Sequence, residues 1–143
     1  MKLTNEEGRK LLNKQAKKKP VSKWRLPKLT ESQQQSESVD WFREQYPQYT
    51  LLFYAVPNGG YRSKRTAATM QREGQLSGVP DLVLAVPKNG FHGLYIEQKI
   101  KGNKPTENQL NVMAALTAQG YFCKVVYSLD EFKKTIESYL TAL

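Results

Sequence analysis

Beyond about residue 28, the spacing of hydrophobic and polar residues is typical of short strands alternating with amphipathic helices. Four apolar runs have the length and composition of strands, at residues 51–56, 82–86, 94–100 and 121–126. Four other stretches have helical composition or helix-start signals, at residues 31–46, 63–73, about 107–119 and about 129–140. The resulting order predicts an α/β domain with a central mixed sheet of about four strands flanked by helices.

Local signals mark where these helices begin and end. Thr30 is a suitable N-cap for the first helix, and Pro47 ends it because proline cannot continue a helix. The segments 106–109 and 128–131 match the capping box, in which Ser or Thr precedes Glu or Gln by three residues. Gly74 has the position of a left-handed residue that ends the second helix.

The second and third strand candidates flank residues 87–93, a segment rich in turn-forming residues. Such a segment between two apolar runs is typical of a β-hairpin. A hairpin centred near Asn89 pairs residues whose numbers add up to about 178, so Asp81 is expected to face Glu97 within side-chain reach. Lys99 follows two residues later and points to the same side of its strand as Glu97.

Two carboxylates and an ammonium beside apolar strand residues are costly unless they have partners or a cation. Mg²⁺ and Mn²⁺ prefer carboxylate oxygens and water, and one or two protein carboxylates plus phosphate oxygens commonly suffice. Asp81 and Glu97 are therefore candidate ligands, with the main-chain carbonyl of Gln98 as a further one, because the Gln98 side chain points to the opposite face. Lys99 could orient an attacking water or neutralise a developing anion. The alternative is an ordinary cross-strand salt bridge.

Charge is concentrated at the start of the chain. Residues 1–28 contain ten Lys and Arg against two Glu, a net charge of +8, which leaves +1 of the total +9 for residues 29–143. A basic arm of this kind attracts polyanions with little sequence preference, because binding releases their condensed counterions. A solvated tail that promotes solubility is the alternative. The composition thus indicates a basic arm at 1–28 and a domain at 29–143.

Other composition features exclude several classes of site. The single cysteine, Cys123, excludes an internal disulfide and a zinc site built from several cysteines, and its apolar surroundings favour a buried thiol. No apolar run approaches the length of about 20 residues that spans a bilayer. We therefore expect no membrane association and a cytoplasmic location. His92, the only histidine, is expected to be a surface residue of the hairpin loop.

The ordered set of motifs resembles the VRR-NUC family (virus-type replication-repair nucleases) of the PD-(D/E)XK nuclease superfamily, over about residues 29–135. The matching segments are Thr30-Glu31 with Gln35 and Trp41; Val56-Pro57-Asn58-Gly59-Gly60 with Arg62; Glu73-Gly74; Gly78-Val79-Pro80-Asp81-Leu82; Ile96-Glu97-Gln98-Lys99; and Glu107-Asn108-Gln109. A PD and an ExK motif alone occur by chance in many chains, whereas the whole ordered set is specific. The basic arm lies outside the resemblance.

The resemblance implies a restriction-endonuclease-like core, dependence on Mg²⁺ or Mn²⁺, and DNA as the substrate. Carried over, Asp81 and Glu97 would be metal ligands and Lys99 the catalytic lysine. Glu31 would add a carboxylate, directly or through water, although a first-turn acid can also simply complement the helix dipole. Gln35 lies on the same helix face as Glu31 and could hydrogen-bond a ligated water or a phosphate.

Gln109 matches a glutamine of the family, and it is also the third residue of a capping box, so it could act in the site or only close the helix. The same resemblance and the local charge give a set of candidate DNA-binding residues. These are Asn58, Gly59, Arg62, Lys64, Arg65 and Lys101. The glycines could equally form a tight turn, and the basic side chains could equally be solvated helix charges.

Small members of this family resemble Holliday-junction resolvases, which place two active sites across a homodimer. We therefore expect a homodimeric, structure-selective DNA endonuclease of recombination or repair that acts on branched or duplex DNA. The resemblance also fits a virus-encoded enzyme, which would be located in the host cytoplasm. The main alternative is a catalytically silent DNA-binding or assembly module that retains the fold. A third hypothesis is a nuclease that acts on RNA.

Overall fold

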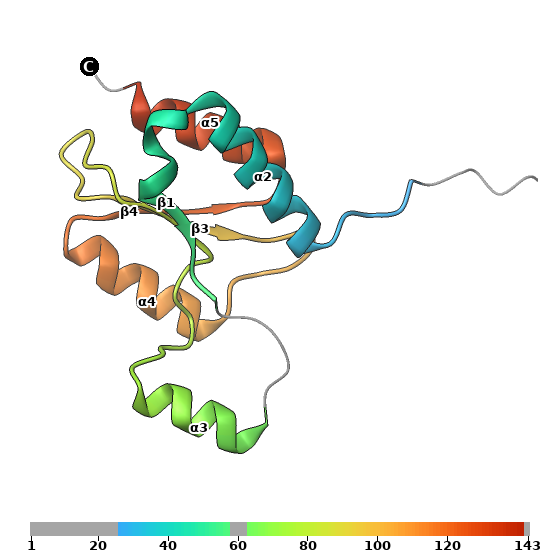
Figure 1. Ribbon diagram of the computed structural model, residues 1–143, viewed down its shortest axis with the longest axis vertical. Helices are drawn as coiled ribbons and strands as arrows, with labels where there is room; N and C mark the ends of the chain where they lie inside the picture. Colours follow the sequence, from blue (N-terminus) through green and yellow to red (C-terminus); the bar gives the residue numbers. More distant parts are fainter. Residues whose placement is uncertain (1–25, 58–62, 142–143) are drawn as a thin grey trace, which may run out of the picture.

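A four-stranded sheet forms the centre of the computed structural model, which describes residues 26–57 and 63–141 (Figure 1). The elements follow in the predicted order, with one additional 3₁₀ helix. They are α2 (Glu31–Gln45), η1 (Pro47–Leu52), β1 (Phe53–Ala55), α3 (Lys64–Arg72), β2 (Leu82–Leu84), β3 (Leu94–Gln98), α4 (Glu107–Ala118), β4 (Phe122–Val126) and α5 (Leu129–Leu140). Residues 1–25 of the basic arm, and Asn58, Gly59 and Arg62 among the DNA-binding candidates, lie outside the described residues.

The strands lie side by side in the order β1-β2-β3-β4, and the sheet is mixed. The pairs β1–β2 and β2–β3 are antiparallel, whereas β3 and β4 are parallel. Helices α2 and α5 cover one face of the sheet and α4 covers the other, while α3 projects away from the body (Figure 1). The expected α/β architecture is confirmed.

Apolar side chains fill the space between the sheet and the helices α2 and α5. In β2 and β3 every second residue points into this layer, because side chains alternate between the two faces of a strand. Phe42 of α2 and Phe132 of α5 close the layer from above, and Phe42 packs against Phe53 with ring centroids 4.0 Å apart. The buried residues of this core are Phe42, Phe53, Leu82, Leu84, Val86, Leu94, Ile96, Val126, Phe132, Ile136 and Tyr139.

The hairpin between β2 and β3 has the predicted register. Leu82 pairs with Ile96 and Leu84 with Leu94, so paired residue numbers add up to 178 as expected. The tip is a two-residue turn in which Lys88 and Phe91 exchange backbone hydrogen bonds. Asn89 and Gly90 between them have φ values of 55° and 78°, the conformation that twists a hairpin in the direction of its strands.

The strands are shorter than the apolar runs predicted. The largest difference concerns residues 51–56, of which only Phe53–Ala55 form β1, whereas Pro47–Leu52 form η1. Pro47 starts this helix with a preset φ, and the Thr50 hydroxyl donates to the Pro47 carbonyl, which stabilises the tight turn. Leu51 therefore lies in a helical turn with 94% of its surface exposed and does not enter the core.

Most of the predicted caps are present, and one is only half formed. The capping box at Thr106 is complete, and Gly74 has a φ of 101° as its C-terminal position requires. At Ser128 the hydroxyl accepts from the Glu131 N–H, but the Glu131 carboxylate accepts from Tyr127 N–H, 2.8 Å away, instead of from Ser128. The predicted capping box at the start of α5 is therefore wrong in its second hydrogen bond, because the carboxylate reaches one residue further back.

Two smaller expectations concern single residues. Cys123 is half-buried in β4 and not fully buried as its apolar surroundings predicted, because β4 is an edge strand with neighbours on one side only. His92 is exposed as expected and lies edge-on to Tyr121, with ring centroids 5.7 Å apart. None of the helices among the residues described here is long and apolar enough to cross a membrane.

Candidate active site

The β2–β3 hairpin brings Asp81 and Glu97 together on the α4 side of the sheet. Asp81 immediately precedes β2, and its main-chain carbonyl accepts a hydrogen bond from Val56 N–H, 2.8 Å away. Its Oδ2 accepts from the backbone N–H of Gln98 at 2.8 Å. These two contacts attach Asp81 to β3 and to the chain that follows β1, so its carboxylate has a fixed place beside Glu97.

The loop that ends in Asp81 lies against the start of α4. Gly78 has a φ of 89°, and a Cβ at this position would lie 2.7 Å from the main-chain carbon and oxygen of Asn108. Only glycine fits both the conformation and the contact. The close approach fixes the distance between the Asp81 loop and the helix that carries Gln109.

Glu97 is the most buried acid of the site, with 1% of its surface exposed. Its Oε1 accepts from Lys99 Nζ at 3.0 Å and from Gln109 Nε2 at 2.6 Å. Its Oε2 is equally buried but has no hydrogen-bond partner among the described residues. A buried carboxylate oxygen without a donor is costly, so this atom is suited to a positive ligand.

The two carboxyl groups hold their protons more tightly than exposed acids. The pKa of Glu97 is raised to about 6, first by burial and further by the charges of Asp81 and Glu31, while the hydrogen bond from Lys99 opposes the shift. Burial also raises the pKa of Asp81, while the Gln98 N–H and the charge of Lys99 lower it. When ionised, Asp81 and Glu97, with Glu31 nearby, carry more negative charge than the single ammonium of Lys99 balances.

Lys99 remains an ammonium group in this environment. Burial lowers its pKa, but the hydrogen bond to Glu97 and the charges of Glu97, Glu31 and Asp81 outweigh burial, so the pKa is raised overall. Its side chain is 11% exposed. A group with this protonation can donate hydrogen bonds and stabilise an anion, but it is a poor base near neutral pH.

Gln109 combines the two roles that the sequence left open. Its Oε1 accepts from the Thr106 N–H at 2.8 Å and its own N–H donates to the Thr106 hydroxyl, which completes the capping box. The other end of the same amide, Nε2, donates to Glu97. The start of α4 and the orientation of the Glu97 carboxylate are thus determined by one side chain.

Glu31 and Gln35 approach the site from the first turns of α2. Both line a cavity of about 600 Å³ whose wall also includes Asp81. The Glu31 Oε1 accepts from Asn103 Nδ2 at 3.1 Å, which connects α2 to the loop after β3. Asn103 was not recognised from the sequence, because nothing in a loop sequence indicates a partner 72 residues away.

The side chain of Gln98 points away from the carboxylates, as the alternation of β3 predicted. It is 1% exposed and contacts the inward face of α2 at Gln34 and Ser38. These two buried polar residues were also missed. Buried Gln and Ser have no distinctive sequence signal, since both are common on helix surfaces.

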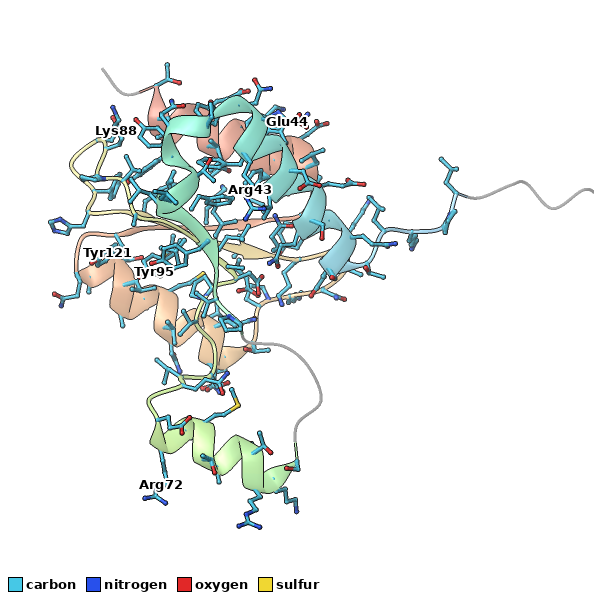
Figure 2. The ribbon with its side chains drawn as sticks, in the orientation of Figure 1. Arg43, Glu44, Arg72, Lys88, Tyr95 and Tyr121 are labelled. Carbon is cyan, nitrogen blue, oxygen red and sulfur yellow. The ribbon has the colours of Figure 1, made fainter. Side chains whose placement is uncertain are left out.

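Two of the candidate DNA-binding residues that the structure describes, Lys64 and Arg65, lie on a helix outside the sheet that carries the carboxylates. Lys64 and Arg65 are exposed at the start of α3, which stands away from the sheet (Figure 1). Arg72 ends the same helix and points away from the body (Figure 2). Lys101 is exposed in the loop after β3. Among the described residues, the only ion pair with the carboxylates that is seen is that of Lys99 with Glu97.

The residues present fit a divalent cation held by two carboxylates. Asp81 and Glu97 come from adjacent strands, and Glu97 offers an oxygen without a donor. Within residues 26–57 and 63–141, no three His, Cys, Asp or Glu side chains are grouped closely enough to enclose an ion. Glu31 therefore fits a contact through water better than direct coordination. Water or phosphate oxygens would complete the shell of a hard cation.

Comparisons with known proteins identify the family of the chain. The family model of the VRR-NUC domain matches residues 29–130. A solved structure described as a VRR_NUC domain protein is 28% identical and has a TM-score of 0.70, covering 80% of this chain and 91% of its own. A second, described as a VRR_NUC domain, is 22% identical with a TM-score of 0.47, covering 74% of this chain and 97% of its own. No curated protein matches the chain.

The match of the family model extends over most of the described residues and includes Asp81, Glu97, Lys99 and Gln109. The first of the two solved structures also bears out the expected nuclease-like core around a mixed sheet. The chain therefore belongs to the VRR-NUC domain family, a family of nuclease type.

Proposed function

We propose that the protein is a divalent-metal-dependent endonuclease that hydrolyses phosphodiester bonds in DNA. The observation that carries the proposal is the state of Glu97. One of its oxygens is paired with Lys99 and Gln109, while the other is buried without a partner among the described residues, next to Asp81. A salt bridge alone would leave this oxygen and the Asp81 charge unbalanced, whereas a bound Mg²⁺ or Mn²⁺ neutralises both.

Each residue of the site has a separate task. Asp81, Glu97 and the main-chain carbonyl of Gln98 would hold the cation, which supplies Lewis acidity and a more acidic water. Lys99 donates hydrogen bonds to the charge that develops on the phosphate oxygens. Gln109 orients the Glu97 carboxylate. Glu31 and Gln35 line the adjoining cavity, where Glu31 accepts hydrogen bonds from water and the Gln35 amide hydrogen-bonds water or phosphate.

The basic residues supply the attraction for DNA. Lys64, Arg65 and Lys101 are exposed on two segments that flank the site in sequence, and we assign them, with Asn58, Gly59 and Arg62, to contacts with the DNA backbone. Lys64 and Arg65 stand in the first turn of α3, where the helix dipole disfavours positive charge. A phosphate close to this turn would relieve that repulsion. The arm 1–28 adds a net charge of +8.

We further propose that two copies associate through the outer face of α4. Residues 108–123 contain no charged residue, although charged residues make up 24% of the chain. Only Met113 of α4 is buried, while Leu110 is 53% exposed and Ala114 and Ala118 are also exposed. Residues 29–143 have a net charge of only +1, so two copies of the domain repel each other weakly, and a neutral apolar face suits self-association better than DNA binding.

A cleavage panel tests the proposed activity and its substrate together. Four-way junction, flap, duplex and single-stranded DNA, and a matched RNA, are incubated with protein in Mg²⁺, Mn²⁺ or chelator. We expect cleavage of branched or duplex DNA in either metal and none in chelator. Binding without cleavage in every condition would instead indicate a catalytically silent DNA-binding or assembly module, and preferential cleavage of the RNA would reassign the substrate.

A further inference from the structure

The face of α2 that contacts the sheet contains buried polar residues where an apolar residue would be expected. Gln34 is 6% exposed and Ser38 is fully buried, and both lie four residues apart on one side of the helix. Opposite them lies Gln98, which is 1% exposed. Burying three polar side chains costs free energy unless each finds its partners.

Their hydrogen bonds form one closed network. Gln34 Nε2 donates to Gln98 Oε1 at 3.3 Å and to the main-chain carbonyl of Lys99 at 3.1 Å. Gln98 Nε2 donates to Ser38 Oγ at 2.9 Å. The Ser38 hydroxyl in turn donates to the Gln34 carbonyl at 3.0 Å. We call these three side chains the Gln34–Ser38–Gln98 network.

The network joins the two elements that carry the acids of the site. Gln98 lies between Glu97 and Lys99 in the chain and points to the opposite face, so it can hold β3 without entering the site. Gln34 lies between Glu31 and Gln35, which are on a neighbouring face of α2. The position of Gln34 relative to Gln98 therefore sets the position of Glu31 and Gln35 relative to Glu97.

Apolar packing would hold α2 on the sheet with at least comparable strength, because well-packed apolar groups of similar volume often match or exceed a buried polar network in stability. Apolar contacts are not directional, however, and tolerate sliding of a helix along a sheet. Hydrogen bonds at fixed distances and angles do not tolerate it. The Gln34–Ser38–Gln98 network thus fixes the position of α2 on the sheet more precisely than apolar packing would, without adding more stability.

We propose that Gln34, Ser38 and Gln98 are positioning residues that fix the start of α2 over the carboxylate site. The inference rests on the proposed metal-dependent function and deepens it. The network touches neither substrate nor ion and acts through Glu31, Gln35 and the backbone of Lys99. Its loss is expected to affect metal affinity and turnover, while the surface that binds DNA stays intact.

The test compares Gln34→Met with Gln45→Met, an equivalent change at an exposed position of the same helix. Mn²⁺ affinity is measured by titration calorimetry well below the melting temperature of each variant. We expect Gln34→Met to weaken Mn²⁺ binding about tenfold, the lower end of what loss of a direct hydrogen-bond partner of a metal ligand causes, because Gln34 acts on the site through other residues. In cleavage assays its kcat falls while its KM for DNA stays within about threefold. Gln45→Met is expected to behave as the unmodified protein.

A merely structural role would lower the melting temperature of Gln34→Met without changing the Mn²⁺ affinity of the folded protein, and this result would overturn the proposal. If Gln34→Met does not fold, Ser38→Ala removes the Gln98 contact with a smaller change and is held to the same criteria.

Hydrogen exchange of the metal-free protein separates this proposal from the proposed function. We expect faster exchange of the amides of residues 34–38 and 100–103 in Gln34→Met than in Gln45→Met, whether or not the protein binds metal. Suppose that Gln34→Met exchanges faster but the unmodified protein binds no Mn²⁺. This result would confirm that the network fixes α2 on the sheet, but it would overturn both the metal site and the positioning role. Unchanged exchange would overturn the positioning role alone.

Discussion

The raised pKa of Glu97 determines the pH range in which the proposed site can bind metal. A metal ligand must be a carboxylate, so protons and cations compete for this side chain. Burial has raised its pKa to about 6, which places the competition within one to two pH units of neutrality. An exposed glutamate would lose its charge only in more acidic solution.

We therefore expect the affinity for Mn²⁺ to fall as the pH is lowered through about 6. The raised pKa means that the folded protein gains a proton on Glu97 below this value, and each further pH unit should weaken the apparent affinity about tenfold. The raised pKa of Asp81 makes the decline steeper where both acids titrate. Titration calorimetry at about pH 7.5, 6.0 and 5.0 measures the change. Equal affinity at the highest and lowest pH would show that Glu97 is not a ligand.

Gln109 and Gln33 provide a matched pair of residues. Each is the third residue of a complete capping box, at the start of α4 and α2 respectively, but only Gln109 also contacts Glu97. Gln33→Ala and Gln109→Ala should each destabilise the protein by about 0.5–1 kcal/mol through the lost cap.

Only Gln109→Ala is expected to reduce cleavage further, by about 10- to 100-fold, because it removes a hydrogen bond from a metal ligand. Thermal unfolding and single-turnover cleavage of both variants make the comparison. Equal cleavage by the two variants would restrict Gln109 to closing the helix.

At the scale of elements, local sequence patterns predicted what depends on near neighbours in the chain. The register of β2 against β3 places Asp81 opposite Glu97. The turn at Asn89 and Gly90 does not set this register alone, because Lys88 and Phe91 pair across it with a sum of 179 and one extra residue on the β2 side shifts the pairing to 178. The failures lie where two local tendencies compete. Residues 51 and 52 are apolar enough for a strand, yet Pro47 starts a 3₁₀ helix that includes them.

The position of Asp81 depends on the close packing of Gly78 against the start of α4. Gly78→Ala combines a left-handed conformation with a Cβ 2.7 Å from the Asn108 backbone, which cannot easily move. Gly90→Ala has a similar φ of 78° but open space around the added Cβ. We expect destabilisation of about 1–2 kcal/mol for Gly90→Ala from the conformation alone. For Gly78→Ala we expect about 1–3 kcal/mol more from overpacking. Denaturant unfolding measures the free energy of unfolding of both variants. An equal decrease in the two would mean that the loop at Gly78 is not tightly packed against α4.

At the scale of the whole molecule, the sequence predicted the class of fold and the central residues of the site better than the contacts that hold them. Asp81, Glu97 and Lys99 belong to one hairpin, so pairing between two neighbouring strands relates them. The bonds from Gln34 to Gln98 and from Asn103 to Glu31 join residues 64 and 72 positions apart, and only the packing of α2 on the sheet creates them. No local pattern encodes such pairs.

The exposed, uncharged face of α4 is also a property of the whole molecule. Tyr95 of β3 and Tyr121 lie on the α4 side of the sheet (Figure 2). Their rings meet edge to face, with centroids 5.4 Å apart. Ala114→Glu introduces a charge at the centre of the face without disturbing the core. We expect it to convert a dimer into a monomer, because two such charges would meet across a two-fold axis.

Light scattering coupled to size exclusion, over a range of concentrations, measures the mass of both forms. Ala68→Glu, an exposed alanine of α3, serves as the control and should remain dimeric. A monomeric unmodified protein at all concentrations would exclude this interface.

The central claim is that the Asp81 and Glu97 carboxylates share a cation that drives hydrolysis of DNA. The most direct measurement is single-turnover cleavage of a four-way junction and a duplex in Mn²⁺ by the unmodified protein and by Asp81→Asn, with DNA affinity measured separately in Ca²⁺. We expect Asp81→Asn to lose cleavage by ~10³-fold or more and to keep its DNA affinity within about threefold, because Asp81 does not contribute positive charge. Cleavage by Asp81→Asn at the unmodified rate, or equal cleavage by the unmodified protein in chelator, would contradict the account.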